Sequence, residues 1–265
     1  MKYDLDNKCV VITGGTSGIG EALAYAMIEQ NARVVVCGRN QKKIDEINNY
    51  GKEHGVDLYA FRAEVDKVSE IKALCDYAVK TLGTIDVWVN NTGISVLSPF
   101  NKLSEEDFDK VVNTNFKSYW YGAAFASDVM KAQKKPGVII NTSSFNQHMP
   151  SAEKAIYCAT KGAVGSITKV FAAELGKFGI RVVSVSPGYT LTPINEIELQ
   201  RPGERERLSA AIPLKKFATT DDMVAAYMFL ASDGAAYIDG VDLRVDGAKF
   251  AVQNPLWSWT FEGDC

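Results

Sequence analysis

The chain has 265 residues, of which 46% are hydrophobic, and this length and composition predict one α/β domain over residues 1–265 with a well-buried core. A formal net charge of −3 argues against nucleic acid or an anionic membrane as a partner. Five scattered cysteines and only two histidines show no metal-ligand spacing, so no metal site is expected. The lack of a signal-peptide core or of a membrane-length apolar run favours a cytoplasmic protein.

The first predicted element is a short apolar run at 8–13, which leads into the glycine-rich turn T-G-G-T-S-G-I-G at 13–20 and an amphipathic segment at 21–30. This order predicts a strand, a tight turn and a helix. Glycines let the backbone approach a ligand closely, and the free N–H groups that start the helix favour a pyrophosphate. An ordinary strand-to-helix turn is the alternative. The residues predicted to bind a dinucleotide here are Gly14, Thr16, Ser17, Gly18, Ile19 and Gly20.

The second predicted strand, at 33–37, ends in Gly38-Arg39-Asn40. Folds that bind NAD usually carry an acidic residue near this point, which holds the ribose 2′-hydroxyl. Arg39 stands here instead, and a guanidinium matches a 2′-phosphate in charge and geometry, with Ser17 as a further hydrogen-bonding group. The pattern therefore favours NADP(H), unless Arg39 only caps or solvates the turn.

The rest of the chain continues the alternation of strands and helices. Further strands are predicted at 57–62, 85–89, 137–141, 181–186 and 241–245. Helices are predicted at 41–54, 67–82 and 220–231, together with a long helix that begins at 104 and another that contains 157–161 and ends at about 178. This alternation predicts an α/β fold with a doubly wound parallel sheet of the Rossmann type, about seven strands, and helices on both faces.

Polar residues follow two of these strands. Glu64 and Val65 follow the third strand and are expected at the adenine edge of a dinucleotide, whereas Asn90-Asn91-Thr92-Gly93 follows the fourth. The carboxyl ends of strands in such a sheet present ligand-facing groups, although an Asn pair also bonds readily to loop backbone. Asn115 falls inside a predicted helix, where asparagine is unfavourable, so it either faces solvent, holds a water or distorts the helix.

The strongest catalytic pattern is Tyr157 and Lys161, four residues apart in a predicted helix and therefore on one face. A phenol has a pKa of about 10, and a nearby cation is expected to lower it. The Ser144 hydroxyl, just before this helix, could bind the oxygen that gains or loses the proton. The alternative is a helix that carries one tyrosine and one solvated lysine.

Substrate contacts are expected in the segments 94–97, 145–150 and 152–156, at Tyr189, and in a flap at about 189–218. Phe145, Met149, Ile156 and Tyr189 are large and apolar or amphipathic, which suits a bulky hydrophobic alcohol. His148 either bonds a polar group of the substrate or is an exposed loop histidine. Three arginines of the flap, Arg201, Arg205 and Arg207, either attract an acidic substrate tail or form a solvated helix face. The tail at 249–265, with Trp257, Trp259 and Phe261, covers a pocket or packs on a neighbouring subunit.

Together these motifs resemble the short-chain dehydrogenases/reductases, from residue 8 to about 248. The resemblance rests on Thr13-Gly14-x-x-x-Gly18-x-Gly20, Asn90-Asn91-Thr92-Gly93, Asn115, Ser144 thirteen residues before Tyr157, Tyr157-x-x-x-Lys161, and Pro187-Gly188 followed by Thr190 and Thr192. Two departures are Thr92, where the family usually has alanine, and Glu64, where it usually has aspartate.

The resemblance implies an NADP(H)-dependent oxidoreductase that interconverts a secondary alcohol and a ketone. In the family pattern Tyr157 moves the proton, Ser144 bonds the reacting oxygen, Lys161 lowers the pKa of Tyr157 and binds the nicotinamide ribose, and Asn115 holds a water that links Lys161 to solvent. The implied cofactor contacts beyond the glycine turn are Arg39, Glu64, Val65, Asn91, Gly93, Tyr157, Lys161, Pro187, Gly188, Thr190 and Thr192. A homotetramer or homodimer is also implied, through the two long helices and the last strand.

The substrate expected first is a hydroxysteroid or bile acid, which would place the protein in steroid metabolism. A sugar-alcohol dehydrogenase and a 3-oxoacyl-carrier-protein reductase are alternatives of the same reaction type. An alternative of another class is a non-catalytic NADP(H)-binding sensor, which would be expected to lose Tyr157 or Lys161, whereas both are present.

Overall fold

The apolar runs of the sequence form one parallel sheet in the computed structural model, which describes residues 3–251. The strand order is β3-β2-β1-β4-β5-β6-β7, and every neighbouring pair is parallel. The strands are β1 (Cys9–Thr13), β2 (Arg33–Gly38), β3 (Leu58–Arg62), β4 (Val87–Asn90), β5 (Gly137–Thr142), β6 (Ile180–Pro187) and β7 (Asp242–Val245). The order reverses between β1 and β4, which is the point where an open parallel sheet leaves a crevice for a ligand.

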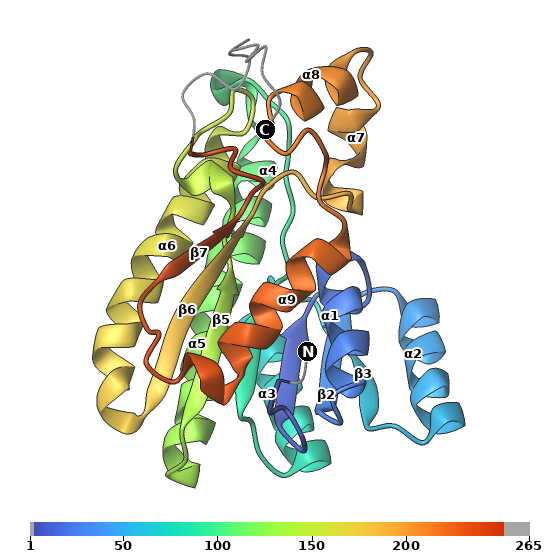
Figure 1. Ribbon diagram of the computed structural model, residues 1–265, viewed down its shortest axis with the longest axis vertical. Helices are drawn as coiled ribbons and strands as arrows, with labels where there is room; N and C mark the ends of the chain where they lie inside the picture. Colours follow the sequence, from blue (N-terminus) through green and yellow to red (C-terminus); the bar gives the residue numbers. More distant parts are fainter. Residues whose placement is uncertain (1–2, 252–265) are drawn as a thin grey trace, which may run out of the picture.

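Helices cover both faces of this sheet, as the sequence predicted (Figure 1). One face carries α1 (Gly18–Ile28), α2 (Gln41–His54) and α9 (Thr220–Ala231), and the other carries α3 (Val68–Leu82), α5 (Ser118–Gln133) and α6 (Ala155–Leu175). The doubly wound fold predicted from the alternation of strands and helices is therefore confirmed. None of the helices in residues 3–251 combines the length and apolar character needed to cross a bilayer.

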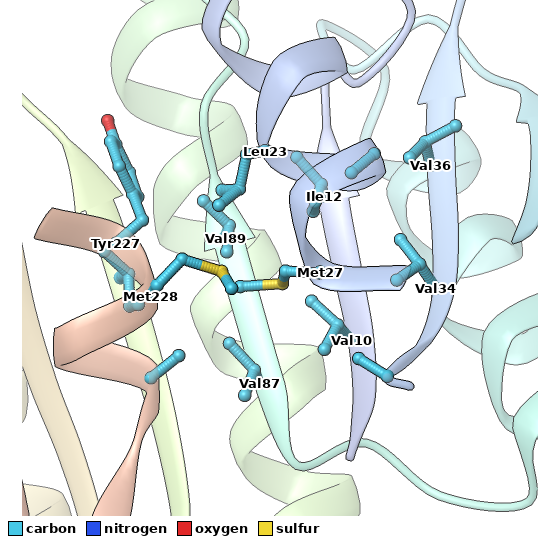
Figure 2. Packing of buried hydrophobic residues seen from close by; sticks show 14 of the residues in the cluster. Val10, Ile12, Leu23, Met27, Val34, Val36, Val87, Val89, Tyr227 and Met228 are labelled. Atoms are coloured by element: carbon cyan, nitrogen blue, oxygen red, sulfur yellow. The ribbon is translucent and has the colours of Figure 1, made fainter. Parts of the chain in front are cut away.

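The strands are apolar throughout because both of their faces are buried. In β1, Val10 and Ile12 face α1 and α9, whereas Cys9 and Val11 face the opposite helical layer. Figure 2 shows the first of these layers, in which Leu23 and Met27 of α1 and Tyr227 and Met228 of α9 lie over the valines of β1, β2 and β4. This packing fixes the strand ends, from which the loops of the candidate site extend.

The helix that contains Asn115 is interrupted. It begins as α4 (Glu105–Val112), continues as a π-helical segment (Asn113–Lys117) and resumes as α5. Asn115 is completely buried in the π-helical segment. Of the roles that the sequence left open, exposure to solvent is excluded and distortion of the helix is observed.

The segment at 189–218 contains only short helices. They are a 3₁₀ turn (Pro193–Asn195), α7 (Glu196–Leu199) and α8 (Glu204–Ala210), and α7 and α8 lie at the top of the molecule in Figure 1. Further 3₁₀ turns are Phe100–Lys102, Phe145–Gln147, Gly176–Phe178 and Asp233–Ala235. Trp257, Trp259 and Phe261, which the sequence suggested as a cover for a pocket or a subunit contact, lie outside the described residues.

The packing of α1 on the sheet gives a stability prediction. Leu23→Ala removes a side chain with no exposed surface and leaves a cavity, so it is expected to cost about 2–5 kcal/mol of unfolding free energy. Leu214→Ala is the matched control, because Leu214 is 65% exposed and its loss is expected to cost less than about 0.5 kcal/mol. Chemical denaturation of both variants measures the difference, and equal losses would contradict this account of the core.

Candidate active site

A cleft with a volume of about 700 Å³ opens at the carboxyl ends of the strands. The loops that follow β1 to β6 all contribute to its lining. The lining includes these residues predicted from sequence: Gly14, Thr16, Ser17, Gly18, Ile19, Arg39, Val65, Asn91, Gly93, Ser144, Phe145, Tyr157, Lys161, Pro187, Gly188, Tyr189, Thr190 and Thr192. Five predicted residues are not in the lining, namely Gly20, Glu64, Asn115, Met149 and Ile156.

The glycine-rich turn after β1 requires glycine at several positions. Gly14 and Gly18 have φ values of +66° and +59°, in the left-handed region that side chains disfavour. At Gly20 an added Cβ would lie 2.5 Å from the Gly14 carbonyl oxygen and from Asn91 Nδ2. Gly20 thus allows α1 to approach the turn, although it does not itself line the cleft. Ser17, at the N-terminus of α1, makes no side-chain cap, so the first amides of the helix remain available to an anion.

The end of β2 carries positive charge and no acidic residue. Gly38 lies against Thr16, and the Thr16 side chain occupies the space that a Cβ at residue 38 would need. Arg39 and Lys43 both line the cleft beside this point, and Lys43 also pairs with Glu46 at 3.2 Å. An acidic side chain could stand at residue 38 only if Thr16 moved, so the adjacent cations set the charge of this end.

Glu64 does not reach the cleft, which corrects its predicted place at the adenine edge. Its carboxylate is paired with Arg62 at 3.0 Å and with Lys67 at 2.6 Å. Both cations help to hold the pKa of Glu64 below its usual value, with Lys67 the larger cause. Val65 and Asp66, the next two residues, line the cleft instead.

The two asparagines after β4 have different environments. Asn90 is buried, accepts a hydrogen bond from Trp88 Nε1 (2.7 Å) and donates to Asn141 Oδ1 (2.9 Å). Asn91 lines the cleft and donates to the carbonyl oxygens of Thr13 (3.1 Å) and Gly14 (3.2 Å). Asn90 therefore ties strands together, whereas Asn91 holds the glycine-rich turn in place.

Lys161 is a buried cation at the floor of the cleft. Its ammonium donates to the carbonyl oxygen of Thr142 (2.6 Å) and to the hydroxyl of Tyr119 (3.3 Å), and the side chain is almost entirely inaccessible to water. Burial disfavours the charged form and lowers the pKa of Lys161 from 10.5 to about 7. Tyr119 in turn donates to the same Thr142 carbonyl (3.1 Å), so the three groups are bonded to one another.

Tyr157 lies beside Ser144 and Lys161, as the sequence predicted, but its acidity differs from the expectation. Burial raises the pKa of Tyr157 to about 12, and a hydrogen bond with the Ser144 side chain only partly offsets this. The Lys161 ammonium lies 5.8 Å from the centre of the Tyr157 ring and is engaged by Thr142 and Tyr119. The expected lowering of the Tyr157 pKa is therefore not observed, because desolvation of the phenol outweighs the attraction of a cation that is itself desolvated.

Asn115 acts on the backbone of the loop after β4. Its Oδ1 accepts from the Ile94 amide and its Nδ2 donates to the Ile94 carbonyl oxygen, both at 2.9 Å. The π-helical segment thus fixes Ile94, which lines the cleft together with the adjacent Gly93.

Nearby, the hydroxyls of Thr92 and Ser95 line the cleft and are buried without a hydrogen-bond partner in the described chain. Buried polar groups without partners are expected where a polar ligand binds, so this wall fits a nucleotide cofactor.

The predicted substrate residues divide into wall and support. Phe145 and Tyr189 line the cleft with ring centres 4.9 Å apart, and Met149 packs against their cluster. Ile156 is buried and does not line the cleft. His148 bonds to Asp242 at 2.9 Å, and Arg201 and Arg207 pair with Glu153 (2.9 Å) and Glu204 (2.6 Å) on the exposed surface. These last three side chains therefore have partners within the chain.

Sequence reasoning did not single out two cleft-side groups, Tyr119 and Lys154, although Lys154 lies in the segment 152–156 that was predicted to contact the substrate. Tyr119 contacts Lys161 from one helical turn after Asn115, and Lys154 lines the cleft from three residues before Tyr157. Both spacings place the side chain near a predicted catalytic residue on a helix. That helical spacing was the available signal, although it does not reveal a partner on a distant segment.

Comparisons with known proteins identify a matching family model and related dehydrogenases. The family model described as enoyl-(acyl carrier protein) reductase matches residues 14–248. The chain is 37% identical to 3beta-hydroxysteroid dehydrogenase 1 of Eggerthella lenta over 248 residues, which cover 93% of this chain and 95% of that protein. It is 35% identical to the 3alpha-hydroxysteroid dehydrogenase of Mediterraneibacter gnavus over 246 residues, which cover 92% and 97%. The solved structure of a gluconate 5-dehydrogenase from Burkholderia cenocepacia J2315, in complex with NADP and tartrate, has a TM-score of 0.89 at 28% identity and covers 94% of this chain and 97% of that one.

The buried Lys161 gives a prediction of stability against pH. Between pH 7 and 10.5 the unfolded chain holds a proton on this lysine that the folded chain has lost, so the free energy of unfolding rises with pH in this window. Lys161→Met removes the penalty, so the variant is expected to melt a few degrees above the wild type at pH 7, with the difference narrowing toward pH 10. Thermal unfolding followed by circular dichroism at several pH values measures this.

The control for this experiment is Lys169→Met, on the exposed face of the same helix. It is expected to stay within about 0.5 kcal/mol of the wild type at every pH. If Lys161→Met were destabilised at pH 7, the two hydrogen bonds of the ammonium would outweigh its desolvation.

Proposed function

The chain belongs to the short-chain dehydrogenase/reductase family and is an oxidoreductase that acts on alcohols, and we propose that it interconverts a secondary alcohol and a ketone with NADP(H), on a bulky hydrophobic substrate such as a hydroxysteroid. The observation that carries this proposal is the meeting of Ser144, Tyr157 and Lys161 in one cleft with the glycine-rich turn and Arg39. Proton-moving groups and a dinucleotide-sized crevice in one cavity are what alcohol oxidation and ketone reduction require.

The residues of the chain divide the chemistry between them. When bound, the nicotinamide supplies or accepts the hydride at the carbonyl carbon. Tyr157 donates its phenolic proton to the carbonyl oxygen during reduction and accepts it back during oxidation. Burial keeps the pKa of Tyr157 at about 12, so the phenol is protonated at neutral pH and ready for the reductive direction. Ser144 bonds the reacting oxygen, Lys161 holds the nicotinamide ribose, and Asn115 holds a water that exchanges protons with Lys161.

Two observations support NADP(H) over NAD(H). Arg39 and Lys43 line the cleft after β2, and Thr16 fills the space that an acidic side chain at residue 38 would need. Two cations match the two charges of a 2′-phosphate, and an acidic partner for a 2′-hydroxyl is lacking at the end of β2. The Burkholderia structure, which contains NADP, shows that a related fold accepts this cofactor.

The hydroxysteroid proposal rests on the apolar wall and on the relatives. Phe145 and Tyr189 present aromatic surface to the cleft, which suits a rigid apolar ring system. Two of the related proteins are named for hydroxysteroids. A sugar-alcohol or sugar-acid substrate is the second candidate, because a related structure is a gluconate 5-dehydrogenase.

The remaining alternatives and the assembly stay predictions. A 3-oxoacyl-carrier-protein reductase would need basic residues at the cleft mouth for an acidic partner, whereas the flap residues Arg201 and Arg207 are already paired with carboxylates. A non-catalytic sensor would not need the intact set of Ser144, Tyr157 and Lys161. A homotetramer or homodimer would cover the exposed Phe108, Trp120 and Val170 on α4, α5 and α6.

The proposed function is tested by following NADPH absorbance with a panel of ketones that includes keto-steroids and keto-sugars. Tyr157→Phe is expected to fold and bind NADPH but to lose about 10²–10⁴-fold in turnover, because the reacting oxygen loses its proton donor. Near wild-type turnover in this variant would overturn the assignment of Tyr157. Turnover of keto-sugars alone by the wild type would replace the steroid by the second candidate.

Cofactor choice is tested with Arg39→Ala. Removing one charged contact to a 2′-phosphate is expected to lower kcat/KM for NADPH by about 10-fold or more and to leave kcat/KM for NADH nearly unchanged. Lys42→Ala is the matched control, since Lys42 is an exposed cation of the same segment outside the cleft lining. An equal loss for both cofactors would show that Arg39 does not read the 2′-phosphate.

A further inference from the structure

A second buried lysine lies in the cleft. Lys154 immediately precedes α6, is only 5% exposed, and lines the same cavity as Tyr157. Its ammonium lies 5.9 Å from the centre of the Tyr189 ring, which belongs to the apolar wall. A cation in this position is costly to bury unless its charge and its three N–H donors are used.

The charge of Lys154 is balanced from outside the cleft. Its ammonium donates to Glu198 of α7 at 2.6 Å, and the two side chains are 7% and 13% exposed. Glu198 itself is not among the residues that line the cleft. It is the one acceptor found for Lys154 among the described residues, which leaves donor capacity on the ammonium for a ligand.

A second ion pair joins the same two segments of the chain. Arg201, three residues further along the chain, pairs with Glu153 at 2.9 Å, beside Lys154. The amide of Ser98 also donates to the Glu153 carbonyl oxygen at 2.9 Å, so the loop after β4 is attached to the same point. In the first pair residue 154 supplies the cation and the flap supplies the anion, whereas in the second pair the charges are reversed. The two pairs together therefore favour one alignment of the flap segment against residues 153 and 154. The pair of Lys154 and Glu198 is thus a fixed feature of the substrate wall.

We propose that Lys154, neutralised by Glu198, determines substrate specificity on the wall of the cleft that carries Tyr189, and selects an uncharged oxygen such as a hydroxyl over a carboxylate. An uncharged oxygen needs only a donor, and the ammonium supplies one. A carboxylate would lose its hydration to meet a cation that Glu198 already compensates, and it would also be repelled by Glu198. The inference rests on the proposed function. It narrows the substrate class to ketones and alcohols that carry a second, uncharged oxygen.

The test uses three steroid ketones that share one ring ketone and end in a methyl, a hydroxymethyl or a carboxylate group. The wild type is expected to prefer the hydroxymethyl compound. Glu198→Gln keeps the shape and the acceptor but removes the negative charge, so the ratio of kcat/KM for the carboxylate to that for the hydroxymethyl compound should rise about 10-fold or more. Lys154→Met should lose the preference for the hydroxymethyl over the methyl compound, mainly through KM.

The matched control is Arg201→Gln, which breaks the neighbouring exposed pair in the same flap segment. If the two ion pairs only hold the flap closed, Arg201→Gln and Glu198→Gln will change kcat/KM for all three ketones by a similar factor, and the proposal is overturned. An unchanged ratio in Glu198→Gln, with melting temperature and NADPH binding intact, also overturns it. Failure of the wild type to reduce any of the three overturns the proposed function and this inference together, whereas reduction with an unchanged ratio overturns the inference alone.

Discussion

The structure of the site depends on one carbonyl oxygen, that of Thr142 at the end of β5. It accepts from the Lys161 ammonium at 2.6 Å and from the Tyr119 hydroxyl at 3.1 Å, and thereby joins the central sheet to α6 and α5. The Thr142 hydroxyl meets Tyr227 of α9 at 2.8 Å on the opposite face of the sheet. These hydrogen bonds fix the position of the Lys161 ammonium, but burial removes most of its hydration. The pKa of Lys161 is lowered because the charged form is poorly hydrated. The helices of both layers must therefore pack correctly before Lys161 can stand beside Tyr157.

The same packing explains why the cleft is assembled from so many separate segments. Parallel strands end at one edge of the sheet, so the loops after β1 to β6 converge there. Hydrogen bonds between loops then fix their relative positions, as when Asn91 bonds the turn at Gly14 and Asn115 bonds Ile94. The π-helical segment orients Asn115 for this contact, which a regular helix would place differently.

The sequence predicted the fold and most of the cleft because these features follow from local patterns. Apolar runs, the glycine turn and the spacing of Tyr157 and Lys161 are each contained in a short stretch of chain. Glu64 was misplaced because its partners Arg62 and Lys67 draw the carboxylate away from the cleft, which only the folded side chains reveal. The acidity of Tyr157 was misjudged because burial depends on the whole fold. Lys154 was predicted only as part of the segment 152–156, and its ion pair was not foreseen because its partner Glu198 is 44 residues away.

Positive charge is balanced by carboxylates to different extents in two parts of the cleft, and the two parts therefore suit different ligands. After β2, Arg39 and Lys43 border the cavity. Lys43 pairs with the exposed Glu46, and no ion pair of Arg39 is found within residues 3–251, so net positive charge faces the ligand. On the wall that carries Tyr189, Lys154 is paired with the partly buried Glu198 and contributes donors with little net charge. A multiply charged nucleotide is favoured by the first environment, and a neutral substrate with a polar oxygen by the second. Lys161 lines the same cleft, and its burial lowers the pKa of its ammonium to about 7.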